Sequence, residues 1–165
     1  MTGPGTTPKG TTLLTEILDE SCVLLDMTAT SKSAAIDSLV DVLVKAEVVT
    51  DRDRMIEDIV RREQVMSTGI GGGIAVPHAQ SQGATRLALT LGRLGQPIDF
   101  ESLDERPVRL VFMVVGPEER GGFIRVLARI SRLLYSGDLQ RNLFRARTQA
   151  EAIECIRHEE SKVTG

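Results

Sequence analysis

The segment 108–115 constrains the fold of this chain more than any other feature. It reads Val-Arg-Leu-Val-Phe-Met-Val-Val, so seven of its eight side chains are apolar. β-Branched and aromatic residues favour strands, and a strand with apolar residues facing both ways must be covered on both sides. The segment therefore predicts a central strand in a sheet that has helices on both of its faces.

Four stretches with apolar residues at helical spacing supply those helices. They are residues 36–44, 55–60, 123–134 and 152–156. Side chains three and four residues apart share one side of a helix, so each stretch predicts an amphipathic helix. We expect Ser31 or Ser33 to cap the first helix, and Thr148 with Glu151 to form a capping box at the start of the last.

Shorter apolar segments between these helices predict the other strands. Residues 22–25 and 74–76 are strand-sized, and Pro77 is expected to stop the second because proline has no N–H for a ladder. Residues 87–92 alternate leucines with smaller residues, which predicts a half-buried strand before a turn at 95–97. The order of elements predicts an α/β fold, with a mixed β-sheet flanked by helices on both faces.

The chain length suits one domain. We expect a single domain at residues 11–160, preceded by a flexible N-terminal tail at residues 1–10 that holds three glycines and two prolines.

Composition and charge exclude several classes of function. Aromatic residues make up 3% of the chain and the formal net charge is −3, so neither base stacking nor a basic surface favours a nucleic-acid partner. Cys22 and Cys155 lie far apart without metal-binding spacing, which predicts neither a disulfide nor a zinc site. No apolar run is long enough for a membrane span and the first residues do not resemble a secretion signal, so we expect a cytoplasmic protein without membrane insertion.

Of the two histidines, His78 has the surroundings that suggest chemistry, whereas His158 reads as a solvated residue near a helix end. His78 follows residues 67–73, which hold four glycines and are expected to form neither a helix nor a strand, and then the short strand that ends at Pro77. A neutral imidazole is a nucleophile near neutral pH. A histidine that simply ends a strand fits the same pattern, so spacing alone leaves both interpretations open.

The neighbouring residues suit a histidine that accepts a phosphoryl group. Backbone N–H groups at Gly69 and Gly71 could approach a phosphate closely, and Ser67 and Thr68 add hydroxyl donors. Arg62 offers a guanidinium that can bind a phosphoryl group through two hydrogen bonds.

Three other chemistries fit this segment less well. A nucleotide-binding glycine loop would precede a helix, whereas this one precedes a strand. A hydrolase could pair Ser67 or Ser81 with His78, but the chain has no G-x-S-x-G elbow. No ligand spacing points to a metal, so we expect neither a metal nor another cofactor.

The pattern formed by residues 62–63 (Arg-Glu), 67–71 (Ser-Thr-Gly-Ile-Gly) and 73–78 (Gly-Ile-Ala-Val-Pro-His) closely resembles a known signature. It is that of the enzyme IIA domain of bacterial phosphotransferase systems, in the fructose/mannitol type that includes the nitrogen-related regulators. The resemblance extends over about residues 13–157 and includes Ser31-Lys32 at a helix start.

The resemblance implies a fold and a set of roles. It implies a mixed sheet flanked by helices, with His78 accepting a phosphoryl group from a small HPr-like phosphohistidine carrier protein. Arg62 would neutralise the phosphoryl group, and a regulatory protein or a sugar-transport component would be the next partner. No metal or nucleotide would be needed, because the donor arrives already activated.

One position departs from the family pattern. Many members have a second histidine at the start of the helix after the central strand, and Phe123 stands at that place here. A phenyl ring cannot donate a hydrogen bond to a phosphate, and its negative face would repel one. Either the phosphate site is weakened, or Phe123 turns inward and the other donors suffice.

The leading hypothesis is a phosphocarrier and regulator, a protein-N-phosphohistidine phosphotransferase component of the nitrogen-regulatory branch, because the chain has no fused membrane or carrier domain. Two alternatives remain. One is a regulatory binding module of the same fold that is not phosphorylated, and the other is a small hydrolase that uses His78 as a general base.

Overall fold

The computed structural model describes residues 12–118 and 122–163, so the tail predicted at residues 1–10 lies outside the described part of the chain. The helices are α1 (Leu14–Ile17), the 3₁₀ turn η1 (Glu20–Cys22), α2 (Lys32–Lys45), α3 (Arg52–Val65), α4 (Phe123–Leu134), α5 (Asp138–Arg145) and α6 (Gln149–Val163). The strands are β1 (Val23–Met27), β2 (Gly69–Gly71), β3 (Ile74–Ala75), β4 (His78–Gln80), β5 (Ala88–Ile98) and β6 (Val108–Gly116).

β6 is the centre of the sheet, as its apolar sequence predicts. The strand order is β1-β5-β6-β3-β2, and β4 also pairs with β6. β6 is antiparallel to β5 and parallel to both β3 and β4, so the sheet is mixed. The side chains from Leu110 to Val115 are fully buried, because both faces of this strand are covered.

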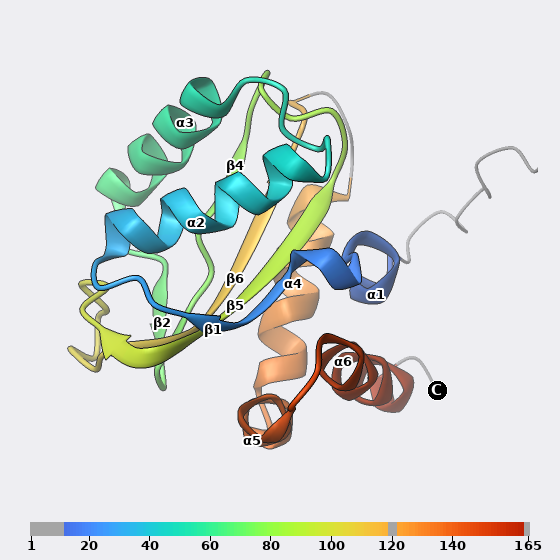
Figure 1. The fold of residues 1–165 in the computed structure, drawn as a ribbon. Helices are drawn as coiled ribbons and strands as arrows, with labels where there is room; N and C mark the ends of the chain where they lie inside the picture. The colour runs from blue at the N-terminus through green and yellow to red at the C-terminus, as the bar shows by residue number, and fades with distance from the viewer. Residues whose placement is uncertain (1–11, 119–121, 164–165) are drawn as a thin grey trace, which may run out of the picture.

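The helices form a layer on each face of the sheet. α2 and α3 lie together over one face, with α2 against β5 and α3 against β4 (Figure 1). α4 packs on β6 from the opposite face, where α6 reaches β1 and contacts both α1 and α5. This arrangement confirms the predicted fold class. None of the helices in the two described ranges is long and apolar enough to cross a membrane.

Capping side chains begin the helices close to where the sequence predicts. Ser31 caps α2, because its hydroxyl accepts a hydrogen bond from the backbone N–H of Ala34 at 3.1 Å. Before α6, the Thr148 hydroxyl accepts from the N–H of Glu151 at 3.1 Å. The Glu151 carboxylate accepts from the N–H of Arg147 at 2.6 Å, so the return bond of the predicted box reaches one residue further back.

β3 ends before Pro77, as the sequence predicts, but pairing with β6 resumes directly after the proline. β3 and β4 follow each other along the same side of β6, with Ile74 opposite Leu110 and His78 opposite Val114. Proline lacks an N–H but keeps its carbonyl, and the Pro77 carbonyl accepts a hydrogen bond from the Val114 N–H at 3.1 Å. His78 therefore begins a second short strand.

Two glycine-containing segments also form strands where the sequence predicts none. Residues 67–73 contain β2 and the tight turn into β3, in which Gly71, Gly72 and Gly73 have φ values of +97°, +67° and +82°. These conformations strain any residue with a side chain, which explains the run of glycines. Residues 95–97, expected to form a turn, instead lie within β5 beside a shift in its register with β6.

β5 is buried on both faces, so the prediction of a half-buried strand was also wrong. Residues 88–91 are all buried. The small residues of the pattern allow a helix to approach closely, since a Cβ on Gly92 would lie 3.1 Å from Cδ2 of Leu39 in α2. The Thr90 hydroxyl is satisfied inside the core, because it donates to the carbonyl of Cys22 at 2.7 Å.

Candidate functional site

His78 lies half-buried at the start of β4, where α3 and α4 leave two adjoining hollows. The larger hollow has a volume of about 810 Å³ and the smaller one about 250 Å³. Both are lined by His78, Arg62 and Leu127, so the imidazole sits where the two hollows meet. The ring is therefore accessible from outside, as a reactive histidine requires.

A backbone carbonyl determines which ring nitrogen of His78 carries the proton. Nδ1 lies 2.8 Å from the carbonyl oxygen of Val76. A carbonyl oxygen can only accept a hydrogen bond, so Nδ1 is the protonated nitrogen of the neutral ring. Nε2 then carries a lone pair and can act as a nucleophile.

The surroundings of His78 favour this neutral form. Burial lowers the pKa of His78 below its ordinary value of 6.5, and the positive charge of Arg62 lowers it further. The bond to Val76 and the negative charge of Glu63 act in the opposite direction without reversing the shift. The lone pair on Nε2 is therefore available at neutral pH.

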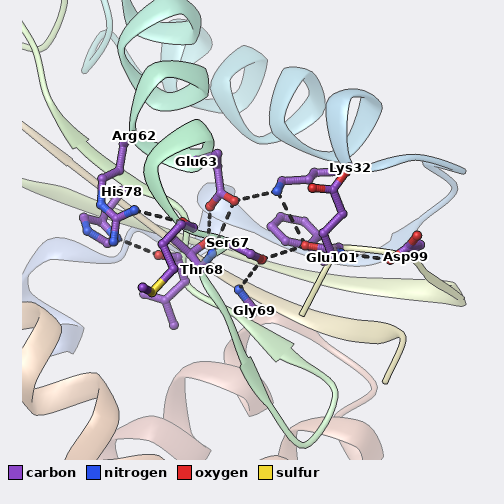
Figure 2. Close-up of polar contacts among 12 residues, drawn as sticks. Lys32, Arg62, Glu63, Ser67, Thr68, Gly69, His78, Asp99 and Glu101 are labelled. Carbon is purple, nitrogen blue, oxygen red and sulfur yellow. Dashed lines mark hydrogen bonds and ion pairs between the residues drawn. The ribbon is translucent and has the colours of Figure 1, made fainter. Parts of the chain in front are cut away.

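Arg62 extends from the last turn of α3 toward His78 (Figure 2). Its Nη1 donates to the carbonyl oxygen of Met66 at 2.9 Å, which fixes the guanidinium beside the imidazole. A guanidinium has five N–H donors, and this one is only partly buried and lines both hollows, so it can also bind an incoming anion. The predicted pairing of Arg62 with His78 is present in the structure.

Three of the predicted phosphate-binding residues line the smaller hollow, but internal bonds engage their donors. The Ser67 hydroxyl donates to the carbonyl of Phe100 at 2.7 Å and accepts from the N–H of Gly69 at 3.1 Å. The Thr68 hydroxyl and N–H both donate to the carboxylate of Glu63. These residues shape the wall of the hollow.

Gly71 is the one member of the predicted group that the structure separates from His78. It lines neither hollow and belongs to the turn between β2 and β3. At the tip of this turn, the N–H of Gly72 donates to the carboxylate of Asp104 at 3.0 Å. The glycine run therefore builds a hairpin, and only its first part reaches the site.

Sequence reasoning gave no role to a buried ion pair beside the smaller hollow. Nζ of Lys32 lies 2.6 Å from Oε2 of Glu63, whose side chain is 5% exposed (Figure 2). Glu63 falls within the signature quoted from the sequence and Lys32 only within the wider resemblance, and 31 positions separate them. No periodic pattern links such distant residues, so their pairing could be found only in the folded structure.

Phe123 lies directly beside His78, where the comparison of motifs places it. The centroids of the two rings are 5.9 Å apart and their planes are inclined by 54°. Phe123 is the first residue of α4 and its side chain is buried. A carbon ring thus stands next to the imidazole, at the position where the family resemblance implied a second histidine in many members.

Five exposed apolar side chains surround the two hollows. We call this group the apolar rim; it consists of Val65, Met66, Ile70, Leu103 and Ile124. Their side chains are between 51% and 79% exposed. A cluster of exposed apolar residues around a reactive group is typical of a surface that contacts another protein.

The other candidate chemistries are not assembled around His78. The Ser67 hydroxyl points to Phe100, and the Ser81 hydroxyl is buried and accepts from the N–H of Gly83 at 3.0 Å. Within the part of the chain that the structure describes, no three metal-ligating side chains come together. His158 lies exposed on α6, and both cysteines are free thiols.

In comparisons with known proteins, the chain matches one family model and relatives of the same kind. Residues 16–159 match the family model described as phosphoenolpyruvate-dependent sugar phosphotransferase system, EIIA 2. The chain is 36% identical over 144 residues to the fructose-specific EIIABC component of the PTS system from Bacillus subtilis, which covers 87% of this chain and 23% of that protein. It is 34% identical over 145 residues to a nitrogen regulatory protein from Bradyrhizobium diazoefficiens, which covers 87% of this chain and 93% of that protein.

A solved structure shows the same fold. The crystal structure of the nitrogen regulatory protein IIA-Ntr from Neisseria meningitidis superposes with a TM-score of 0.80 at 26% identity. The match covers 86% of this chain and 97% of that one.

Proposed function

This chain belongs to the EIIA 2 family of the phosphoenolpyruvate-dependent sugar phosphotransferase system, and we propose that it accepts a phosphoryl group on Nε2 of His78 from an HPr-like carrier protein. One observation carries the proposal: the bond from Nδ1 to the Val76 carbonyl, which leaves the lone pair on Nε2. We place the protein in the cytoplasm, in the nitrogen-regulatory branch of the family.

The transfer needs no base, metal or nucleotide. The lone pair of Nε2 attacks the phosphorus atom of the carrier's phosphohistidine, and a new N–P bond forms. The old N–P bond breaks, and its electron pair returns to the nitrogen of the carrier. The proton on Nδ1 of His78 remains in its bond to the Val76 carbonyl throughout.

Two features stabilise negative charge at this position. The guanidinium of Arg62 lies beside the imidazole and can donate to the oxygens of a phosphoryl group. α4 begins at Phe123, next to the His78 ring, and the N-terminal end of a helix carries a partial positive charge. Arg62 and the N-terminal end of α4 would therefore partly compensate the negative charge of the phosphoryl group.

The apolar rim supports a protein as the donor. Its five side chains face solvent around the two hollows, as in a surface that contacts another protein. A carrier protein could cover the rim and bring its own phosphohistidine to His78. The same surface would change its preference for partners once phosphorylated, because the added charge lies at its centre.

Phe123 favours one alternative, a regulatory binding module of the same fold that works without phosphorylation. The ring gives the phosphoryl group no hydrogen bond at a place where many relatives have a histidine. Under this alternative, the rim binds a partner and His78 contributes only its shape and polarity.

Intact-mass spectrometry after incubation with a phosphorylated HPr-like carrier separates the two functions. We expect one added phosphoryl group that is acid-labile and absent in the variant His78→Ala. The variant His158→Ala serves as the matched control and should load like the wild type, since His158 is exposed on α6. No mass increase with any cognate carrier would support the binding module.

The variant Phe123→His tests how far the phenyl ring weakens the site. A second imidazole would add one charge-assisted hydrogen bond worth about 1.5–3 kcal/mol, so loading should accelerate by roughly 10- to 100-fold. Phe123→Leu is the control, because it removes the ring without supplying a donor. An unchanged or slower rate in Phe123→His would contradict this expectation.

A further inference from the structure

A single buried carboxylate joins four segments of the chain next to the site. Glu63, in the last turn of α3, accepts from the N–H of Thr68 at 3.2 Å and from the Thr68 hydroxyl. Its other partner is the ammonium of Lys32, in the first turn of α2, at 2.6 Å. Lys32 also lies 3.5 Å from the carbonyl oxygen of Phe100, to which the Ser67 hydroxyl donates (Figure 2).

From Thr68 the bonds continue to the imidazole. The carbonyl of Thr68 accepts from the N–H of Val76 at 2.9 Å, and the carbonyl of the same Val76 accepts from Nδ1 of His78 at 2.8 Å. Val76 is thus bonded to Thr68 through its N–H and to the imidazole of His78 through its carbonyl. An unbroken series of bonds connects the Lys32–Glu63 pair to His78.

The series gives each group in it a way to influence the next one. A buried carboxylate must be paired and hydrogen-bonded, so Glu63 strongly favours one position of Thr68. A fixed Thr68 fixes the Val76 carbonyl, and this carbonyl selects the tautomer of His78. A neutral histidine without such a partner populates both tautomers, and the one with a proton on Nε2 cannot attack phosphorus through that nitrogen.

We propose that Lys32 and Glu63 are positioning residues for His78, which act through Thr68 and Val76 to keep the proton on Nδ1 and the lone pair on Nε2. The inference rests on the proposed function, since it assigns these residues to the same reaction. Neither residue lies in contact with the reacting atoms. Their contribution is the orientation and the tautomer of the nucleophile.

Nitrogen NMR of the imidazole at a pH well above its pKa tests the proposal directly, because it distinguishes the two tautomers without any phosphoryl donor. In the wild type we expect His78 as the Nδ1–H tautomer. In Glu63→Ala both tautomers should appear, and phosphoryl uptake should fall by up to about 100-fold. Glu63→Gln keeps an oxygen that can accept from Thr68, so it should restore most of the wild-type tautomer.

The matched control removes a buried ion pair of the same kind elsewhere. Arg129 and Glu160 lie 2.7 Å apart, with side chains 13% and 3% exposed, and neither lines the two hollows. Glu160→Gln should lower stability and leave the tautomer of His78 unchanged. If Glu63→Ala does not fold, Thr68→Val replaces it, since it removes the hydroxyl bond to Glu63 and keeps the shape.

The outcomes separate this inference from the proposed function. Folded Glu63→Ala or Thr68→Val with the wild-type tautomer alone would overturn the positioning role. An equal change of tautomer in Glu160→Gln would overturn it too, because it would show a general effect of instability. A wild-type protein that takes up no phosphoryl group, yet shows the expected tautomers, would count against the proposed function and not against the positioning.

Discussion

The pair of His78 and Arg62 combines two requirements that usually conflict. A nucleophilic imidazole must be neutral, and a phosphoryl acceptor must lie near positive charge. Arg62 would serve both under the proposed function, because its charge lowers the pKa of the neighbouring ring and would attract the phosphoryl oxygens. One side chain thus prepares the free site and would stabilise the loaded one.

At this scale we predict that Arg62→Met changes the pH profile as well as the rate. Loss of the guanidinium removes one of the causes that lower the pKa of His78, so this pKa should rise toward 6.5. The neutral form would then be lost at a higher pH than in the wild type. Phosphoryl uptake should also slow by roughly 10- to 100-fold, through loss of a charge-assisted donor worth about 1.5–3 kcal/mol.

An NMR titration of His78 together with uptake rates between pH 5 and 8 measures both effects. Arg61→Met is the matched control, because Arg61 lines the larger hollow but pairs with Glu57 at 2.7 Å. It should change neither the pKa of His78 nor the rate by much. A lower pKa of His78 in Arg62→Met would contradict the electrostatic explanation.

Among the elements, helices could be predicted from the sequence more reliably than short strands. Periodic apolar residues and a capping serine locate α2 without any tertiary information, as Ser31 shows. β2 and β4 have three residues each, and they are strands because β3 and β6 supply their partners. Such pairing depends on residues far away in the sequence, so the local pattern revealed neither β2 within the glycine run nor β4 after Pro77.

The candidate site follows the same division. His78 and Arg62 could be placed from the motif at residues 62–78, and Phe123 from the resemblance to a family; the structure brings all three together. The Lys32–Glu63 pair could not, because it depends on how α2 and α3 pack side by side. The motif could suggest which hydrogen-bond donors are present. It could not show that the N–H and hydroxyl of Thr68 already donate to the carboxylate of Glu63.

At the level of elements we predict that Gly69→Ala destabilises the protein through β2. A methyl group on Gly69 would collide with the side chain and backbone of Ser102, in the loop that carries Leu103 of the apolar rim. We expect a loss of about 1–3 kcal/mol in the free energy of unfolding, measured by urea denaturation. Gly95→Ala is the control, since a methyl group there would lie 3.7 Å from the carbonyl oxygen of Met27, an ordinary contact distance. Equal stability of the two variants would show that the loop yields to the methyl group.

For the whole molecule, Glu160 connects the two ends of the described chain. Its carboxylate accepts from the N–H of Leu14 at 2.7 Å and from the N–H of Thr15 at 3.2 Å, and it pairs with Arg129 of α4. One buried group on α6 therefore holds α1 and α4 in place. Figure 1 shows these three helices gathered at one side of the sheet.

We predict that Glu160→Ala destabilises the packing of α1 and α4 against α6. Removal of one partner of a buried pair leaves Arg129 uncompensated, so the free energy of unfolding should fall by about 3–5 kcal/mol. Hydrogen exchange should accelerate first at the amides of Leu14 and Thr15. Glu154→Ala, which breaks an exposed pair with Arg157 on the same helix, should cost less than about 1 kcal/mol. Unchanged exchange at Leu14 would refute the role of Glu160.

The attachment of His78 to the most deeply buried strand limits how its two proposed states can differ. β4 pairs with β6 immediately after Pro77, so the backbone beneath the imidazole is immobilised by the core itself. A phosphoryl group on a histidine with such a fixed backbone would change the electrostatic potential around it. The shape of the surrounding protein surface would stay almost unchanged. A partner could then tell the two states apart only by attraction and repulsion, which dissolved ions damp over roughly 8 Å under physiological conditions. The ionic strength of the cell would thus determine how strongly a partner discriminates between the phosphorylated and the free protein.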